Sequence, residues 1–144
     1  MPPQAVVTQA KLELYTSAKT EVGASTMVGA YDILRTWTED GATWNQARPG
    51  EPWEVAGCGG SSDRATDPVA ISTMEWTKTW QALEGGDLDE LVQRWVSDPP
   101  TNNGLVLAAL TGQARQEWSI PSSQSVIDLT KGPRLMVTFY LEPQ

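Results

Sequence analysis

The chain has 144 residues, which suits one domain with its own hydrophobic core. Its formal net charge is −8, and it contains no histidine and one cysteine, Cys58. This composition argues against nucleic-acid and membrane partners, which are bound through lysine and arginine, and it excludes a Ser-His-Asp triad, an internal disulfide and a cysteine-based zinc site.

The first half of the chain predicts antiparallel strands joined by a long connection. Residues 8–15 alternate between apolar and polar side chains, which is the pattern of a half-buried strand. Residues 27–37 are rich in strand-forming residues and predict another strand. Residues 38–70 hold five of the twelve glycines and three of the ten prolines together with two tryptophans, so we expect a long ordered loop there.

A strand and the one clear helix follow this loop. Residues 71–80 alternate again and predict a single strand. A helix is expected over 87–96, because apolar residues recur there at the spacing of one helix face: Leu88, Leu91, Val92 and Trp95. Asp87 followed three residues later by Glu90 resembles a capping box at the start of this helix.

The last third of the chain predicts further strands. Residues 104–110 form a short apolar run, which indicates a strand buried on both faces, and residues 114–120 and 134–141 predict two more strands. Several short strands, frequent turns and one short helix describe a mostly-β protein with an antiparallel β-sandwich. We expect one such domain over residues 1–144.

The tryptophans of the loop, Trp37, Trp44 and Trp53, have two interpretations. Exposed flat rings beside polar groups in a concave face would bind a sugar, whereas buried rings would fold the loop onto the core. We favour packing and expect Trp44 and Trp53 to be mostly buried. Trp80 and Trp118 are candidate contacts for a glycan or a partner.

Carboxylates are the only catalytic candidates that the composition leaves. The spacing of the loop carboxylates gives no sign of the paired carboxylates that a glycosidase needs, so we expect them to be solvated charges. These residues are Glu39, Asp40, Glu51, Glu54, Asp63 and Asp67. We therefore expect neither enzymatic activity nor a cofactor, and a small packed role for Cys58. Oxygen ligands in residues 61–67, or from Asp98, Asn102 and Asn103, leave a structural calcium ion as an open alternative.

Short motifs stand close together in residues 30–65: Trp37-Thr38-Glu39, Thr43-Trp44-Asn45, Pro49 to Trp53, and Gly57 to Asp63. The segment "DLDELVQRWVSDPPTNNGLVL" and the closing "GPRLMVTFY" continue the pattern. Together these residues resemble the DNRLRE-domain family, from about residue 10 to residue 141.

The resemblance implies a non-catalytic, jelly-roll-like β-sandwich. Modules of this kind occur in surface and secreted proteins of bacteria and archaea and in phage structural proteins, and some related modules bind carbohydrate. The resemblance also implies a structural role for a set of residues that packs the loop over the sandwich: Trp37, Trp44, Asn45, Trp53 and Trp95. The resemblance assigns no binding residues to this chain.

Typical members of the family have further strands before the segment that residues 2–15 resemble. A jelly roll without them leaves sheet edges unpaired, and strands of neighbouring chains can complete such edges. We therefore expect a structural or interaction module of a larger assembly, such as a phage virion decoration (cement) or tail component, and a homo-oligomer. The alternative is a carbohydrate-binding module that binds a polysaccharide.

The two functions imply different locations. The first ten residues lack the basic start and apolar stretch of a signal peptide, and no apolar run is long enough for a transmembrane helix. If Met1 is the native start, the chain is made in the cytoplasm, in keeping with a virion protein. A secreted or cell-surface location belongs to the carbohydrate-binding alternative.

Overall fold

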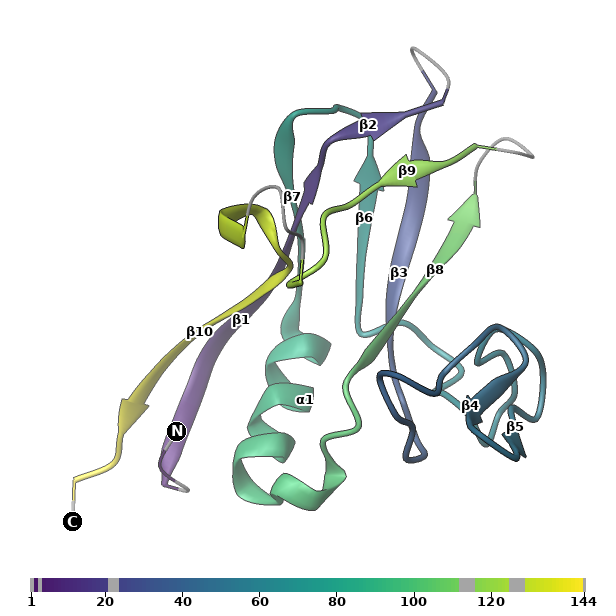
Figure 1. Cartoon of the computed structure of the whole chain (residues 1–144). Coiled ribbons are helices and arrows are strands. Elements are labelled where there is room, and N and C mark those ends of the chain that lie inside the picture. The colour runs from purple at the N-terminus through teal and green to yellow at the C-terminus, as the bar shows by residue number, and fades with distance from the viewer. Residues whose placement is uncertain (1, 3, 21–23, 112–115, 125–128, 144) are drawn as a thin grey trace.

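The computed structural model describes residues 2, 4–20, 24–111, 116–124 and 129–143. The elements within these ranges are β1 (Ala5–Thr16), β2 (Ala18–Lys19), β3 (Thr26–Asp32), β4 (Gln46–Arg48), β5 (Glu51–Pro52), β6 (Ala70–Met74), β7 (Thr79–Glu84), α1 (Gly86–Ser97), η1 (Pro99–Thr101), β8 (Leu105–Thr111), β9 (Trp118–Ser119), η2 (Leu129–Lys131) and β10 (Arg134–Leu141). The expected mostly-β, antiparallel, sandwich-like fold with one short α-helix is confirmed over this part of the chain (Figure 1).

Two three-stranded antiparallel sheets form the body of the fold. One has the strand order β10-β1-β7 and the other the order β6-β3-β8. β6 and β7 contact each other, whereas β10 and β8 are the outer edges of the two sheets (Figure 1). Two short strand pairs lie outside this body, β2–β9 at the top of the view and β4–β5 within the long loop.

The main core lies where both sheets and helix α1 meet. α1 packs against β1, and its apolar stripe is buried as the spacing predicted. The buried core side chains are Ala10, Leu14, Val28, Ala30, Ala70, Met74, Leu83, Leu88, Leu91, Val92 and Trp95.

Helix α1 also completes β1 where β7 no longer accompanies it. β7 pairs with β1 only from Lys11 onwards. Before that point, Asp89 Oδ1 accepts a hydrogen bond of 2.6 Å from the Ala10 N–H, and Gln93 Oε1 accepts one of 2.7 Å from the Val7 N–H. Two helix side chains one turn apart thus satisfy backbone donors that would otherwise be left unpaired.

The helix starts one residue earlier than predicted and ends one residue later. The predicted capping box is wrong, because Asp87 already lies inside the first turn and no side chain caps it. The residue before the helix is Gly85, whose φ of 153° favours glycine. The Gly85 carbonyl accepts hydrogen bonds from the N–H groups of Leu88 and Asp89, both at 3.1 Å.

The prediction of one strand over residues 71–80 is wrong. β6 ends at Met74 and β7 begins at Thr79, with a turn between them in which Lys78 has a φ of 57°. The carbonyl oxygen of Trp76 accepts hydrogen bonds from the Thr16 hydroxyl at 2.7 Å and from the Gln81 amide at 3.1 Å, which holds this turn. The alternation of apolar and polar residues continues by chance through the turn, so the sequence predicts one uninterrupted strand.

Three other predicted strands differ in extent or burial. The strand predicted over 27–37 ends at Asp32, where the loop begins. The expected burial of residues 104–110 on both faces is wrong, because β8 pairs with β3 alone and leaves Leu107 and Leu110 36% and 39% exposed. Of the strand predicted over 114–120, β9 covers Trp118–Ser119, and residues 114 and 115 lie outside the described residues.

Candidate functional site

The long loop is folded around the carboxylate of Asp63. This side chain is fully buried, so the expectation of a solvated charge is wrong here. Its two oxygens accept hydrogen bonds from the N–H groups of Glu54, Val55 and Gly60 at 3.0 to 3.1 Å, and Arg35 lies 3.4 Å away. Burial opposes ionisation, but these donors outweigh it and hold the pKa of Asp63 below its ordinary value.

Other loop carboxylates are also engaged within the loop. Glu54 Oε2 accepts hydrogen bonds from the N–H and hydroxyl of Ser62 at 2.7 and 2.6 Å, and these bonds lower the pKa of Glu54. Glu51 forms an ion pair of 2.7 Å with Arg48, which lowers the pKa of Glu51. In the part of the chain that the structure describes, no three acidic or cysteine side chains are placed to hold a metal ion.

Trp53 anchors a second, smaller core under the loop. Its ring is 9% exposed and packs with Ile33, Ala47 and Cys58, and its indole N–H donates to the Thr43 carbonyl at 2.9 Å. Cys58 is buried as expected, and burial raises the pKa of its thiol. The prediction that Trp53 is mostly buried is therefore confirmed.

The matching prediction for Trp44 is wrong, because its ring is 72% exposed. Its backbone is nonetheless fixed, since the Trp44 carbonyl accepts a hydrogen bond of 2.6 Å from the Gly57 N–H. The ring covers Gly57, where an added Cβ would come within 2.5 Å of it. Trp53 already occupies the small core, so the Trp44 ring lies on the outside of the loop.

The remaining residues of the predicted loop-packing set lie in different places. Trp37 is 38% exposed, and its indole N–H donates to the Asn103 carbonyl at 2.6 Å, which ties the loop to the segment before β8. The side chain of Asn45 is exposed, while its carbonyl accepts from the Trp53 N–H at 3.2 Å. Trp95 lies in the main core and not in the core under the loop.

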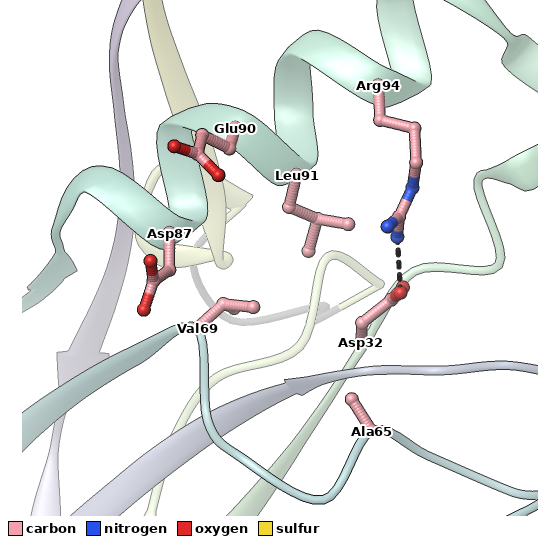
Figure 2. Close-up of a pocket in the computed structure, with 7 residues that line it drawn as sticks. All are labelled: Asp32, Ala65, Val69, Asp87, Glu90, Leu91 and Arg94. Carbon is pink, nitrogen blue, oxygen red and sulfur yellow. Dashed lines mark hydrogen bonds and ion pairs between the residues drawn. The ribbon is translucent and has the colours of Figure 1, made fainter.

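A cavity of about 370 Å³ lies between α1 and the end of the loop (Figure 2). Its lining residues come from the helix and from the segment opposite it: Asp87, Glu90, Leu91, Arg94, Asp32, Ala65 and Val69. Arg94 forms an ion pair with Asp32 across this cavity. Burial raises the pKa of Asp32 although Arg94 opposes the shift. This pair joins α1 to the end of β3.

A larger hollow, of about 540 Å³, surrounds the turn between β6 and β7. Its lining combines an aromatic ring with polar and charged groups: Ser17, Ala18, Lys19, Glu75, Trp76, Thr77 and Lys78. The ring of Trp76 is 67% exposed although its backbone is held by Thr16 and Gln81. No sequence signal separated this tryptophan from those of the core, because the turn was not predicted.

The two tryptophans predicted as glycan or partner contacts are covered by cations. The Arg134 guanidinium lies 3.9 Å from the centre of the Trp80 ring, and Tyr15 meets the same ring edge-on at 5.5 Å. The Lys19 ammonium lies 5.1 Å from the centre of the Trp118 ring, whose indole N–H donates to Thr26. Trp76 presents the more open ring.

Among the described residues, β10 carries five exposed large apolar side chains. This strand pairs with β1 on one side and is the edge of its sheet on the other. Its large side chains are 40% to 52% exposed, and we call them the β10 surface: Leu135, Met136, Phe139, Tyr140 and Leu141. Because successive strand residues point to opposite faces, these side chains leave apolar area open on both faces of the sheet.

An edge strand of this kind has backbone donors and acceptors available as well as apolar side chains. Soluble proteins usually protect such edges with charge, proline or bulges, and β10 carries neither a charge nor a proline between its first and last residues. No helix in the described parts of the chain combines the length and apolar character needed to cross a membrane. Comparisons with protein-family models, with curated proteins and with solved structures find no match for this chain.

Proposed function

We propose that the chain is a non-enzymatic interaction module that assembles with further copies of itself through β10. The observation that carries this proposal is the β10 surface, an apolar edge strand exposed on both faces. A single chain leaves this area in water, where it favours association. A strand from a neighbouring chain would supply both backbone pairing and apolar contacts.

Covering the β10 surface would contribute favourably to the free energy of assembly. Its five large side chains are each about half exposed. Covering a side chain of this type contributes roughly 1 kcal/mol, so the group contributes about 5 kcal/mol per chain before the cost of association. A symmetric interface uses the surface of both chains and doubles this contribution.

The larger structure that we propose for this module is a phage particle, as a decoration (cement) or tail component. The proposal rests on the resemblance to the DNRLRE-domain family, together with an acidic chain that gives no support for nucleic-acid binding. Assembly through an exposed strand suits such a component, because its function consists of binding its neighbours.

Light scattering coupled to size-exclusion chromatography tests the assembly. We expect the wild-type chain at micromolar concentration to have a mass above the 15.7 kDa of one chain. Replacing Tyr140 with lysine places a charge on the β10 surface and should shift the mass towards that of one chain. Ile71→Lys is the matched control, because Ile71 and Tyr140 are 49% and 50% exposed and lie on different sheets. A monomeric wild type would contradict the proposal, as would equal masses for both variants.

Carbohydrate binding remains the second candidate, and the hollow at Trp76 favours it. A flat exposed ring beside hydroxyl and charged groups is the combination that stacks against and orients a sugar. We expect Trp76→Ala to weaken binding to a recognised polysaccharide by roughly tenfold, in a titration followed by calorimetry. Trp44→Ala removes another exposed indole and should leave the affinity unchanged. Failure of the wild type to bind any member of a broad polysaccharide panel would refute this candidate.

A further inference from the structure

We propose that the partner of β10 is β10 of a second copy, paired antiparallel around a two-fold axis at Thr138. This inference rests on the proposed function and specifies its geometry. It follows from the direction of the β10 backbone, from the order of its apolar residues and from the charges at its two ends.

The backbone of β10 sets which residues can pair outward. The Thr138 carbonyl accepts a hydrogen bond of 3.1 Å from the Thr8 hydroxyl of β1, so this carbonyl faces β1. Backbone groups of successive residues point to opposite sides of a strand, which directs those of Val137 and Phe139 away from β1. In a pair of copies related by a two-fold axis, outward-facing residues lie opposite outward-facing residues, so odd-numbered residues of one β10 oppose odd-numbered residues of the other. The two-fold axis then lies at the level of one residue and its own copy, and not between two consecutive residues.

The apolar residues of β10 then match their own copy. With the axis at Thr138, Leu135 lies opposite Leu141 of the second copy, and Val137 lies opposite Phe139. On the other face, Met136 lies opposite Tyr140. Opposed side chains at this spacing are in contact, so each exposed apolar residue of the strand gains an apolar partner.

The charges at the two ends of β10 favour a two-fold axis at Thr138 over an axis at either neighbouring residue. Centring on Thr138 places Arg134 opposite Glu142 of the second copy, and symmetry forms this pair twice. An axis at Phe139 would place Met136 opposite Glu142, and an axis at Val137 would place Arg134 opposite Tyr140. Opposite charges facing each other across paired strands favour the first register.

Glu142 is open for this pairing, whereas Arg134 has to turn its guanidinium outward from its own sheet to join it. Arg134 is 49% exposed and is positioned by Glu13, whose Oε2 lies 2.6 Å from its Nε, and by the Trp80 ring beneath its guanidinium. Glu142 follows the last residue of β10 and is exposed, with no ion-pair partner among the described residues. With its guanidinium turned outward, Arg134 of each copy would pair with Glu142 of the other, one such pair at each end of the apolar residues.

Disulfide cross-linking tests the register directly. In the proposed pair, Thr138 lies opposite its own copy, within the Cα distance of about 4.4 to 6.8 Å that a disulfide spans. We expect Thr138→Cys to form a reducible dimer of twice 15.7 kDa on mild oxidation. The wild-type chain is the control, since its one cysteine, Cys58, is buried.

Two further cysteine variants separate failure of the register from failure of the proposed function. Val137→Cys and Phe139→Cys should cross-link less, because their copies are offset along the strands. Faster cross-linking of either would overturn the axis at Thr138 while retaining association through β10. Association without cross-linking at any of the three positions would overturn β10 as the partner strand. A wild type that remains monomeric would contradict both proposals.

Charge reversal tests the end pairs. Glu142→Arg should weaken association by roughly 2- to 30-fold, the range expected for two exposed ion pairs replaced by repulsion. Combining it with Arg134→Glu should recover part of this loss, although Arg134→Glu also removes the contact with Glu13. Unchanged association of Glu142→Arg would show that charge does not select the register.

Discussion

Replacing Asp63 with alanine is expected to destabilise the chain by about 3 to 5 kcal/mol, because it leaves several buried groups without partners. The N–H groups of Glu54, Val55 and Gly60 all donate to this fully buried carboxylate. Chemical denaturation followed by tryptophan fluorescence measures the decrease in the free energy of unfolding.

The same variant should alter the dependence of stability on pH. The pKa of Asp63 is lower in the folded chain than its ordinary value, so its contribution is complete above the unfolded pKa of about 3.9. That contribution is lost as the pH falls through the folded pKa. We therefore expect the difference in stability between wild type and Asp63→Ala to narrow below about pH 4.

Asp67→Ala is the matched control for this prediction. Asp67 lies four residues further along the same loop, and its side chain is exposed. Its removal deletes the same charge without freeing buried donors, so the expected change is within about 0.5 kcal/mol. Equal effects of the two substitutions would show that the buried hydrogen bonds of Asp63 do not hold the loop.

Trp53→Ala is expected to lower the free energy of unfolding by about 3 to 5 kcal/mol, whereas Trp44→Ala should lower it by less than about 1 kcal/mol. The first substitution empties the core under the loop and removes the indole hydrogen bond to Thr43. The second removes a ring that is 72% exposed and covers Gly57. Both variants lose one tryptophan from one loop, which makes them a controlled pair.

Denaturation followed by far-ultraviolet circular dichroism compares the two variants, since both alter tryptophan fluorescence. Limited proteolysis gives a second measurement, because loss of the small core should expose residues 38–70 to cleavage. A Trp44 variant that is destabilised as strongly as the Trp53 variant would mean that the exposed ring holds the loop closed.

Helix α1 was predictable because its signal is local. Four apolar residues at helical spacing required burial on one side, and all four are in the main core. The strands over 8–15 and 134–141 were located for a similar reason, since alternation over eight residues indicates a strand. Alternation does not detect a turn whose residues continue the pattern, and so the turn at Trp76 was missed.

Burial was less predictable than secondary structure, because it depends on neighbours that are distant in the sequence. Apolar composition predicted burial for Leu107 and Leu110, but they lie on a sheet edge. The loop sequence predicts a solvated Asp63, but three backbone N–H donors from the same loop enclose its carboxylate. A carboxylate gives no sign in the sequence that backbone donors will converge on it.

The sequence by itself determined a mostly-β chain with one amphipathic helix and a long ordered loop, because these features follow from periodicity and composition over short windows. Only the tertiary structure decided which of two similar tryptophans fills the loop core, since that core has room for Trp53 and leaves Trp44 outside. The tertiary structure also decided that β10 is an edge, because strand order depends on how distant segments pair.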